Sequence, residues 1–200
     1  MSAAYFRATD GAPLAAEEAL RTWAAEAYGV LVETASQYGR VVSAEQLAHA
    51  VQDATGVRST ERPSSWVGRV LTLVVYRCSA TGEPPLTSLV VSPSTGTVGP
   101  AYSEVQRVAG QTALSDVARE KAAAQGRLDA YRRYAPDVPA DAEPMLASKF
   151  LAAREKAKRT AKAAMPKRPV VLPPPDVPLT RICPQCFLET PIIGECQNCN

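Results

Sequence analysis

Four of the five cysteines stand as two Cys-x-x-Cys pairs near the C-terminus, and this spacing constrains the chain more than any other feature. The pairs are Cys183–Cys186 and Cys196–Cys199, with nine residues between them. Each pair can direct two sulfurs at one ion from about 2.3 Å, and two pairs complete a tetrahedral shell, so the pattern predicts a zinc site with these four ligands. The last 18 residues cannot fold by burying apolar surface alone, so metal binding has to supply the folding free energy.

The segment 181–200 resembles the short zinc ribbons found at the ends of many bacterial proteins. Pro184 stiffens the first cysteine turn, and Gly194 lets the chain bend into the second. We expect the few apolar contacts of this unit to come from Phe187, Leu188, Ile192 and Ile193. Four thiolates leave no open coordination position, so the resemblance implies a structural zinc and not a catalytic one.

Two other uses of paired cysteines fit the sequence less well. Two disulfides would suit a secreted protein, and a redox-active Cys-x-x-Cys usually stands alone at the start of a helix. Zinc ribbons bind nucleic acid in some proteins and protein partners in others, so the ribbon by itself does not choose between these functions.

Charge is distributed unevenly along the chain, although the net charge is only +2. Residues 1–60 carry a balance of −3, residues 61–142 of +1, residues 143–182 of +6, and the last 18 residues of −2. A basic block therefore lies between a neutral front and a small cysteine-rich tail. No apolar run approaches the roughly 18–20 residues that span a bilayer, and the N-terminus lacks the basic head and apolar stretch of a signal peptide. We therefore expect a cytoplasmic protein with reduced thiols and no membrane contact.

Apolar residues at spacings of three and four predict three helices in the first part of the chain. The first covers 14–38. The second opens at Ser43, where the sequence Ser-Ala-Glu-Gln, ending at Gln46, reads as a capping box, and it stops at Gly56. The third covers 63–80, with Pro at its start and Gly just beyond its end.

A β-hairpin is expected after the third helix. The β-branched run at 86–91 is followed by a Pro/Gly turn at 92–96 and by Thr97-Val98. Three helices followed by a hairpin is the order of a winged helix-turn-helix, so we expect a mainly α fold with a small β-hairpin over 14–102. Residues 1–13 are expected to form a flexible leader.

The third helix of a winged helix usually enters a groove of DNA, and its outward residues suit that role here. Small side chains followed by an arginine allow close approach to a phosphate or a base edge, and two more arginines precede the helix. In the alternative interpretation, Ser64 only caps the helix and Arg69 is a solvated surface charge. The residues predicted to contact nucleic acid here are Arg58, Arg62, Ser64, Ser65 and Arg69.

Several short segments resemble the winged-helix DNA-binding domain of alkylguanine-DNA alkyltransferases and their alkyltransferase-like relatives. These segments are 42–48, 66–71, 89–91 and 99–102, together with Gly96. The reactive Pro-Cys-His-Arg of that family is missing, and Cys78 has no histidine beside it. The resemblance implies the fold and DNA contact through the third helix, without the alkyl-accepting site.

The second half of the chain reads as a helical extension over 103–165 and a Pro-rich linker over 166–180 that leads to the ribbon. The stretch 103–134 is too short for a coiled coil, which favours a helix packed back on the core. From 145 to 165 we expect a basic helix that can neutralise phosphates, although such a run also serves as a solubilising face. Its predicted nucleic-acid contacts are Lys156, Lys158, Arg159 and Lys162.

No catalytic constellation is recognisable in the sequence. His49 is the only histidine and Cys78 has no acid-base neighbour, so both favour packing or surface roles. The first hypothesis is therefore a non-enzymatic nucleic-acid-binding protein that carries zinc; the sequence favours DNA over RNA as the ligand and leaves RNA open. The alternative is a protein-interaction adaptor in which the ribbon and the helical extension hold a partner. The sequence leaves the oligomeric state open.

Overall fold

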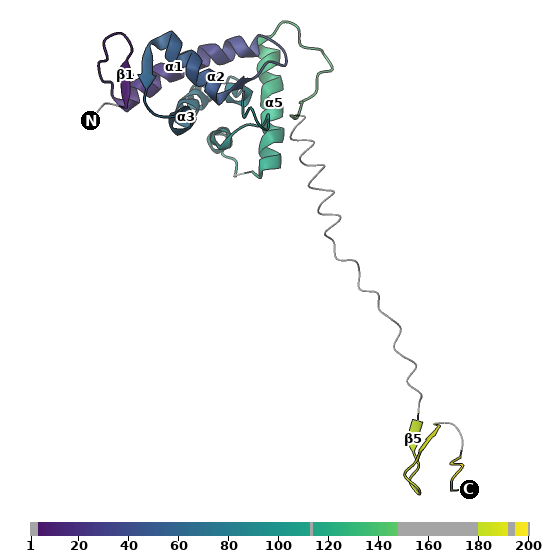
Figure 1. Cartoon of the computed structure of the whole chain (residues 1–200). Helices are drawn as coiled ribbons and strands as arrows, with labels where there is room; N and C mark the ends of the chain where they lie inside the picture. The colour runs from purple at the N-terminus through teal and green to yellow at the C-terminus, as the bar shows by residue number, and fades with distance from the viewer. Residues whose placement is uncertain (1–3, 113, 148–179, 192–194, 200) are drawn as a thin grey trace. The chain divides into compact units, whose positions relative to one another are not determined.

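The computed structural model describes residues 4–112, 114–147, 180–191 and 195–199, which belong to two separate units (Figure 1). In the first unit, residues 4–147, the helices are α1 (Ala16–Ala35), α2 (Ala44–Thr55), α3 (Pro63–Thr81), η1 (Leu86–Leu89), η2 (Pro100–Tyr102), α4 (Ser103–Val108) and α5 (Asp116–Tyr134). Its strands are β1 (Tyr5–Arg7), β2 (Val42–Ser43), β3 (Val57–Ser59) and β4 (Val90–Val91). The second unit contains β5 (Thr180–Ile182) and β6 (Glu189–Pro191). The described residues are therefore mainly helical, as expected.

Two stacked tryptophans form the centre of the first unit. Trp23 of α1 and Trp66 of α3 lie with ring centroids 4.1 Å apart, and neither is more than 1% exposed. The indole N–H of Trp23 donates to the carbonyl of Val57 at 3.2 Å. Aliphatic side chains of α1, α2 and α3 surround this stack in one continuous core. The apolar stripes that predicted the three helices are thus the faces that the helices bury against one another.

The predicted helix ends are confirmed for α2 and α3. The hydroxyl of Ser43 accepts from the backbone N–H of Gln46, whose side chain accepts from the N–H of Ser43. This capping box starts α2, which ends at Gly56 with φ +64°. Pro63 opens α3, and Gly82 ends it with φ +65°. Both glycines adopt the left-handed conformation that closes a helix at little steric cost.

Residues 4–13 do not form the loose leader that the sequence predicts. β1 pairs antiparallel with β3, and Phe6 also forms an isolated bridge with Pro13. The physical reason is Tyr5, whose ring is 6% exposed and packs edge-on against Trp23 at 5.7 Å. The hydroxyl of Tyr5 donates to the carboxylate of Glu61 at 3.1 Å. Burial of one aromatic side chain therefore fixes the start of the chain.

The hairpin predicted for 86–98 is only partly formed, and the strand expected over its first four residues is wrong. Those residues form the 3₁₀ helix η1, in which all four side chains are buried. β4 follows, but it pairs parallel with β2 and meets the returning chain only at the bridge between Val91 and Val98. These elements do not make a two-stranded wing, so the winged-helix assignment stays a prediction.

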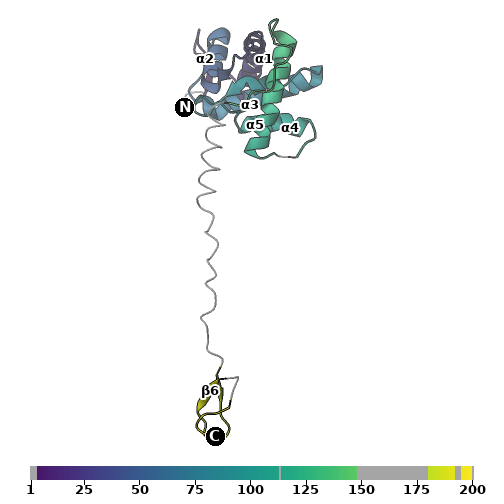
Figure 2. The same ribbon diagram turned by 90° about the vertical axis from the view of Figure 1, so that its right-hand side faces the viewer.

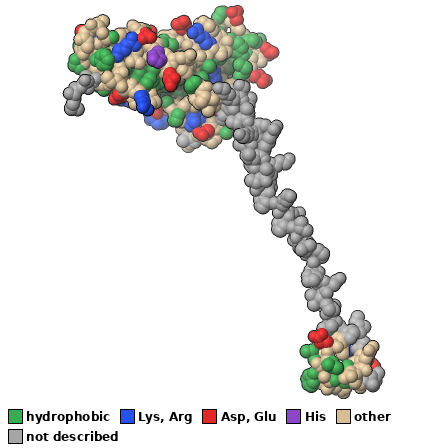
Figure 3. All heavy atoms as spheres, viewed as in Figure 1, with side chains coloured by type: hydrophobic (Ala, Val, Ile, Leu, Met, Phe, Trp, Pro, Cys, Tyr) green, Lys and Arg blue, Asp and Glu red, His purple; other side chains and the backbone are tan. Residues whose placement is uncertain are grey.

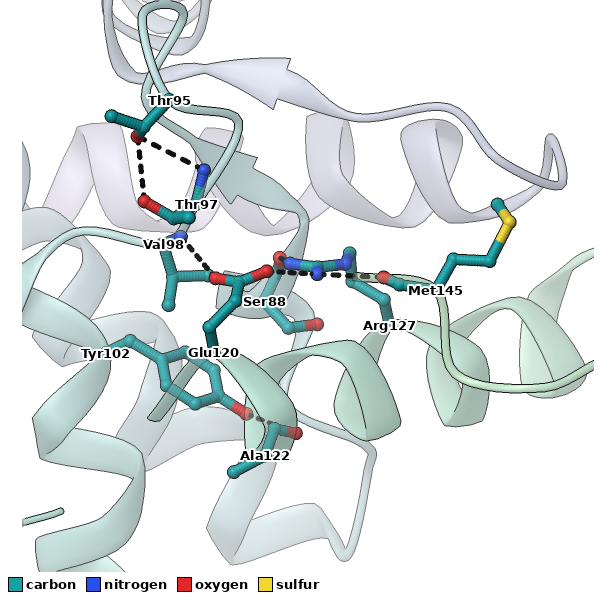
Figure 4. Close-up of polar contacts among 9 residues, drawn as sticks. All are labelled: Ser88, Thr95, Thr97, Val98, Tyr102, Glu120, Ala122, Arg127 and Met145. Atoms are coloured by element: carbon teal, nitrogen blue, oxygen red, sulfur yellow. Dashed lines mark hydrogen bonds and ion pairs between the residues drawn. The ribbon is translucent and has the colours of Figure 1, made fainter. Parts of the chain in front are cut away.

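A buried carboxylate holds the returning chain at Val98 (Figure 4). Glu120 of α5 is 1% exposed, and its Oε2 accepts from the backbone N–H of Val98 at 2.9 Å. Its Oε1 accepts from Arg127 at 2.5 Å, and Arg127 also donates to the carbonyls of Ser88 and Met145. The N–H of Val98 is therefore satisfied by a side chain of α5.

The predicted helical stretch 103–134 is divided into α4 and α5, with Gly110 at φ +68° after α4. α5 packs back on the main core through Ala130 and Tyr131, which confirms that interpretation (Figure 2). The hydroxyl of Tyr131 donates to the carbonyl of Arg40 at 2.6 Å. Residues 103–147 therefore share one unit with the three-helix part.

The basic helix and the Pro-rich linker fall mostly on residues that the structure does not describe. Residues 145–147, the first of the expected helix, are not helical, and the rest of both segments lies outside the described ranges. No helix in the described part of the chain is long and apolar enough to cross a membrane.

Candidate metal centre and candidate nucleic-acid interface

The first cysteine pair lies at the tip of the β5–β6 hairpin. β5 and β6 pair antiparallel, with Ile182 opposite Glu189. The N–H of Cys183 donates to the carbonyl of Leu188, and the N–H of Phe187 donates back to the carbonyl of Cys183, both at 2.9 Å. These two bonds fold the chain between the strands into a tight turn that brings Cys183 and Cys186 to one side.

The four predicted ligands come together, although the two pairs are far apart in sequence. All four sulfur atoms lie within 4.8 Å of one another. The Cys183 and Cys199 sulfurs are 3.9 Å apart, and those of Cys186 and Cys196 are 3.5 Å apart. Zn–S bonds of about 2.3 Å at tetrahedral angles place neighbouring sulfurs about 3.8 Å apart. A disulfide requires about 2.05 Å. The cluster therefore has the spacing of a metal-binding site for an ion such as zinc.

The backbone around the first turn already favours thiolates. The N–H groups of Cys186 and Gln185 lower the pKa of the Cys183 thiol to about 6. A backbone hydrogen bond from Leu188 is the main cause of the lowered pKa of Cys186. The pKa of Cys199 shifts in the opposite direction, because its hydrogen bonds with Cys186, Cys183 and Cys196 raise it to about 12. A divalent cation would remove this conflict by stabilising all four thiolates.

The expected apolar cluster beside the metal is not formed by the two members that the structure describes. Phe187 is 78% exposed and Leu188 is 52% exposed. The other two members, Ile192 and Ile193, lie outside the described residues. Cys183, at 7% exposed, and Thr190 are the buried side chains described in this unit. A unit this small has no interior in which to place a phenyl ring.

Predicted contact residues of α3 meet in one groove of about 510 Å³. Ser64, Ser65, Gly68 and Arg69 form one wall. The opposite wall comes from η2, α4 and the residues after it, so α3 is not a freely protruding helix. A Cβ on Gly68 would reach 3.9 Å from that of Ala101, which shows how closely the walls approach at the inner end.

A second arginine lies across this groove, and sequence reasoning missed it. Arg107 of α4 pairs with Glu104 at 2.5 Å and donates to the hydroxyl of Tyr76. Hydrogen bonds from Arg107 lower the pKa of the Glu104 carboxyl. In sequence, Glu104 and Arg107 form an ordinary i, i+3 surface pair. Only the packing of α4 against α3 shows that this pair faces Arg69.

The other predicted contact residues do not join the groove. Arg58 forms an ion pair with Asp53 at 2.7 Å, and Arg62 occupies the N-cap position of α3 without lining the groove. The hydroxyl of Ser65 donates to the Glu61 carboxylate at 2.9 Å, so one acidic group lies near this end of α3. The predicted contacts of the basic segment, Lys156, Lys158, Arg159 and Lys162, lie outside the described residues.

The folded first unit is not basic as a whole. Residues 4–147 carry thirteen Lys and Arg against sixteen Asp and Glu, a balance of −3. Figure 3 shows Lys and Arg side chains interspersed with Asp and Glu over the face in view.

His49 is exposed on α2, and Cys78 is 2% exposed, with its thiol pKa raised by burial. Neither has the geometry of a general base or a nucleophile.

Comparisons with family models, with curated proteins and with solved structures found no match for this chain.

Proposed function

We propose that this chain is a non-enzymatic nucleic-acid-binding protein that prefers DNA. The observation that carries the proposal is the groove between α3 and α4, where Ser64, Ser65 and Arg69 lie opposite Arg107. Hydroxyl groups at the start of α3 and two arginines in the groove suit a phosphate backbone, because helix N-terminal N–H groups and cationic side chains both favour anions.

Most of the affinity has to come from the basic segment, because the first unit carries a balance of −3. Residues 149–168 contain eight Lys and Arg and one acidic residue, Glu155. If all eight neutralised phosphates, log K would fall against log salt with a slope of about −7 for duplex DNA. The groove then orients the chain on the nucleic acid, and the segment holds it there.

We further propose zinc as the metal of the four-cysteine site. The soft thiolate set and the sulfur spacing suit Zn²⁺, and four protein ligands leave no position for a reacting water. Zinc therefore folds the second unit and takes no part in chemistry.

The test is fluorescence anisotropy with a labelled DNA duplex, a single strand and an RNA hairpin, each between 50 and 200 mM salt. The variant Lys158→Ala/Lys162→Ala should lose about 1.8 from the magnitude of the salt slope, because each phosphate contact contributes about 0.9. Arg69→Ala should weaken binding at every salt concentration.

The matched control is Lys121→Ala/Arg133→Ala, which removes the same charge from exposed positions of α5 that do not line the groove. Its slope should stay that of the natural chain. If both double variants lost the same amount of salt slope, the effect would come from net charge and not from contacts of the basic segment. Absence of binding to all three probes at 50 mM salt would refute the proposal and favour the adaptor hypothesis.

A further inference from the structure

Three large apolar side chains at the tip of the β5–β6 hairpin are exposed. Ile182 is 64%, Phe187 78% and Leu188 52% exposed, and Figure 3 shows hydrophobic side chains at the surface of this unit. We call these three residues the apolar tip. Among the described residues, Phe187 has the most exposed of the large apolar side chains. A small unit cannot bury every apolar group, so exposure alone is not sufficient evidence of a binding surface.

The backbone of Phe187 supplies a second, independent observation. Its φ is +55°, and it is the only non-glycine residue with positive φ in the described part of the chain. The left-handed conformation is unfavourable for a bulky side chain and natural for glycine. Because Phe187 is 78% exposed, it does not recover this strain by burial. A residue that is aromatic, strained and exposed indicates that its ring contacts another molecule.

Charge defines the chemistry of that contact. Four thiolates around a divalent ion carry a net −2, and Glu189 and Glu195 outweigh Arg181, which brings residues 180–199 to −3 with the metal bound. This charge repels a polyanion, so the tip is unsuited to stacking on nucleic-acid bases. It attracts a cationic surface, which leaves a protein partner as the occupant.

We propose that the apolar tip docks into an apolar pocket with a basic rim on a partner protein. Phe187 is the anchor, and Ile182 and Leu188 flank it. The acidic unit around the tip pairs with Lys and Arg of the rim. This proposal does not rest on nucleic-acid binding by the groove and the basic segment, and it gives the apolar tip a partner of its own.

The decisive variant is Phe187→Gly, because docking and a merely structural role predict opposite changes in metal affinity. Glycine relieves the left-handed strain, partly offset by its greater backbone entropy, so zinc should bind about two- to fivefold tighter. Competition with a chelator measures this on the full chain. If the Phe187 ring instead supported the fold, the same variant would bind zinc more weakly.

Docking is measured with a phage-displayed library of random 12-residue peptides, selected on the zinc-loaded full chain. Selected peptides should be rich in apolar residues and in Lys and Arg. They should bind Phe187→Gly at least tenfold more weakly, as expected for an aromatic anchor. Met145→Ser, which removes a 63% exposed apolar side chain from the other unit, is the matched control and should bind them unchanged.

Three results would overturn the proposal. The first is weaker zinc binding by Phe187→Gly. The second is a set of selected peptides that are acidic or that bind Phe187→Gly as well as the natural chain. The third is a single-stranded oligonucleotide that binds the natural chain more tightly than it binds Phe187→Gly. The third result would show that the apolar tip contacts nucleic acid and not a protein. The variant Lys158→Ala/Lys162→Ala should bind nucleic acid more weakly and bind the selected peptides as the natural chain does. Either proposal can therefore be refuted while the other stands.

Discussion

The substitution Arg127→Met should destabilise the first unit by about 3 to 5 kcal/mol. Arg127 donates to Glu120 at 2.5 Å, to Ser88 O at 3.2 Å and to Met145 O at 3.3 Å. Removing it leaves a carboxylate that is 1% exposed with only the N–H of Val98 as donor. Breaking one partner of a buried ion pair typically has this cost, because the remaining charge stays desolvated.

A second substitution separates stranded charge from lost packing. In the Arg127→Met background, Glu120→Leu removes the uncompensated carboxylate, and it leaves the N–H of Val98 without its acceptor at a cost of about 1 to 3 kcal/mol. The double variant should therefore be about 1 to 3 kcal/mol more stable than Arg127→Met alone. This recovery is expected only if the charge, and not the volume of the side chain, dominates the loss.

Urea unfolding followed by tryptophan fluorescence measures these differences in the right unit. The chain has two tryptophans, Trp23 and Trp66, and both lie in the core of the first unit. Arg132→Met is the control, since Arg132 is an exposed residue of the same helix that donates only to a loop carbonyl at 3.1 Å. A loss for Arg127→Met no larger than that of Arg132→Met would refute the reasoning. So would a double variant no more stable than the single one.

Three further predictions concern other parts of the chain. Gly126→Ala, which usually stabilises a helix, should here destabilise by about 1 to 3 kcal/mol in urea unfolding, because its Cβ would lie 2.7 Å from Pro85 Cγ; a gain in stability would contradict the packing. Ser43→Ala should cost about 1 kcal/mol in the same assay through loss of the capping box with Gln46, and no change would show that the cap is dispensable. Elemental analysis should find one zinc per chain and much less in Cys196→Ser, whereas an unchanged content would place the metal elsewhere.

Features that depend on residues close in sequence were predicted well. The capping box at Ser43, Pro63 at the start of α3 and Gly82 at its end were all predicted, because the groups that begin or end a helix lie within one turn of it. The cysteine spacing likewise predicted the four metal-ligand candidates, since each pair is held by its own short turn.

The failed predictions share a dependence on distant partners. The strand β1 could not be predicted without knowing that Tyr5 packs on Trp23, which lies in the next helix. The hairpin after η1 was overpredicted because its β-branched run carries no information about the distant strand β2, with which β4 pairs in parallel. Arg107 was missed because a charged pair at helical spacing is normal on any surface.

The sequence by itself determined where α2 and α3 begin and end and which four sulfurs can hold a metal, because local hydrogen bonding and the reach of a short turn decide both. Only the tertiary structure decided which surfaces those elements present. It set Arg107 opposite Arg69, buried the carboxylate of Glu120 against the N–H of Val98, and left Phe187 exposed. Those outcomes depend on which distant side chains compete for the same buried donors and the same interior volume, and no local pattern records that competition.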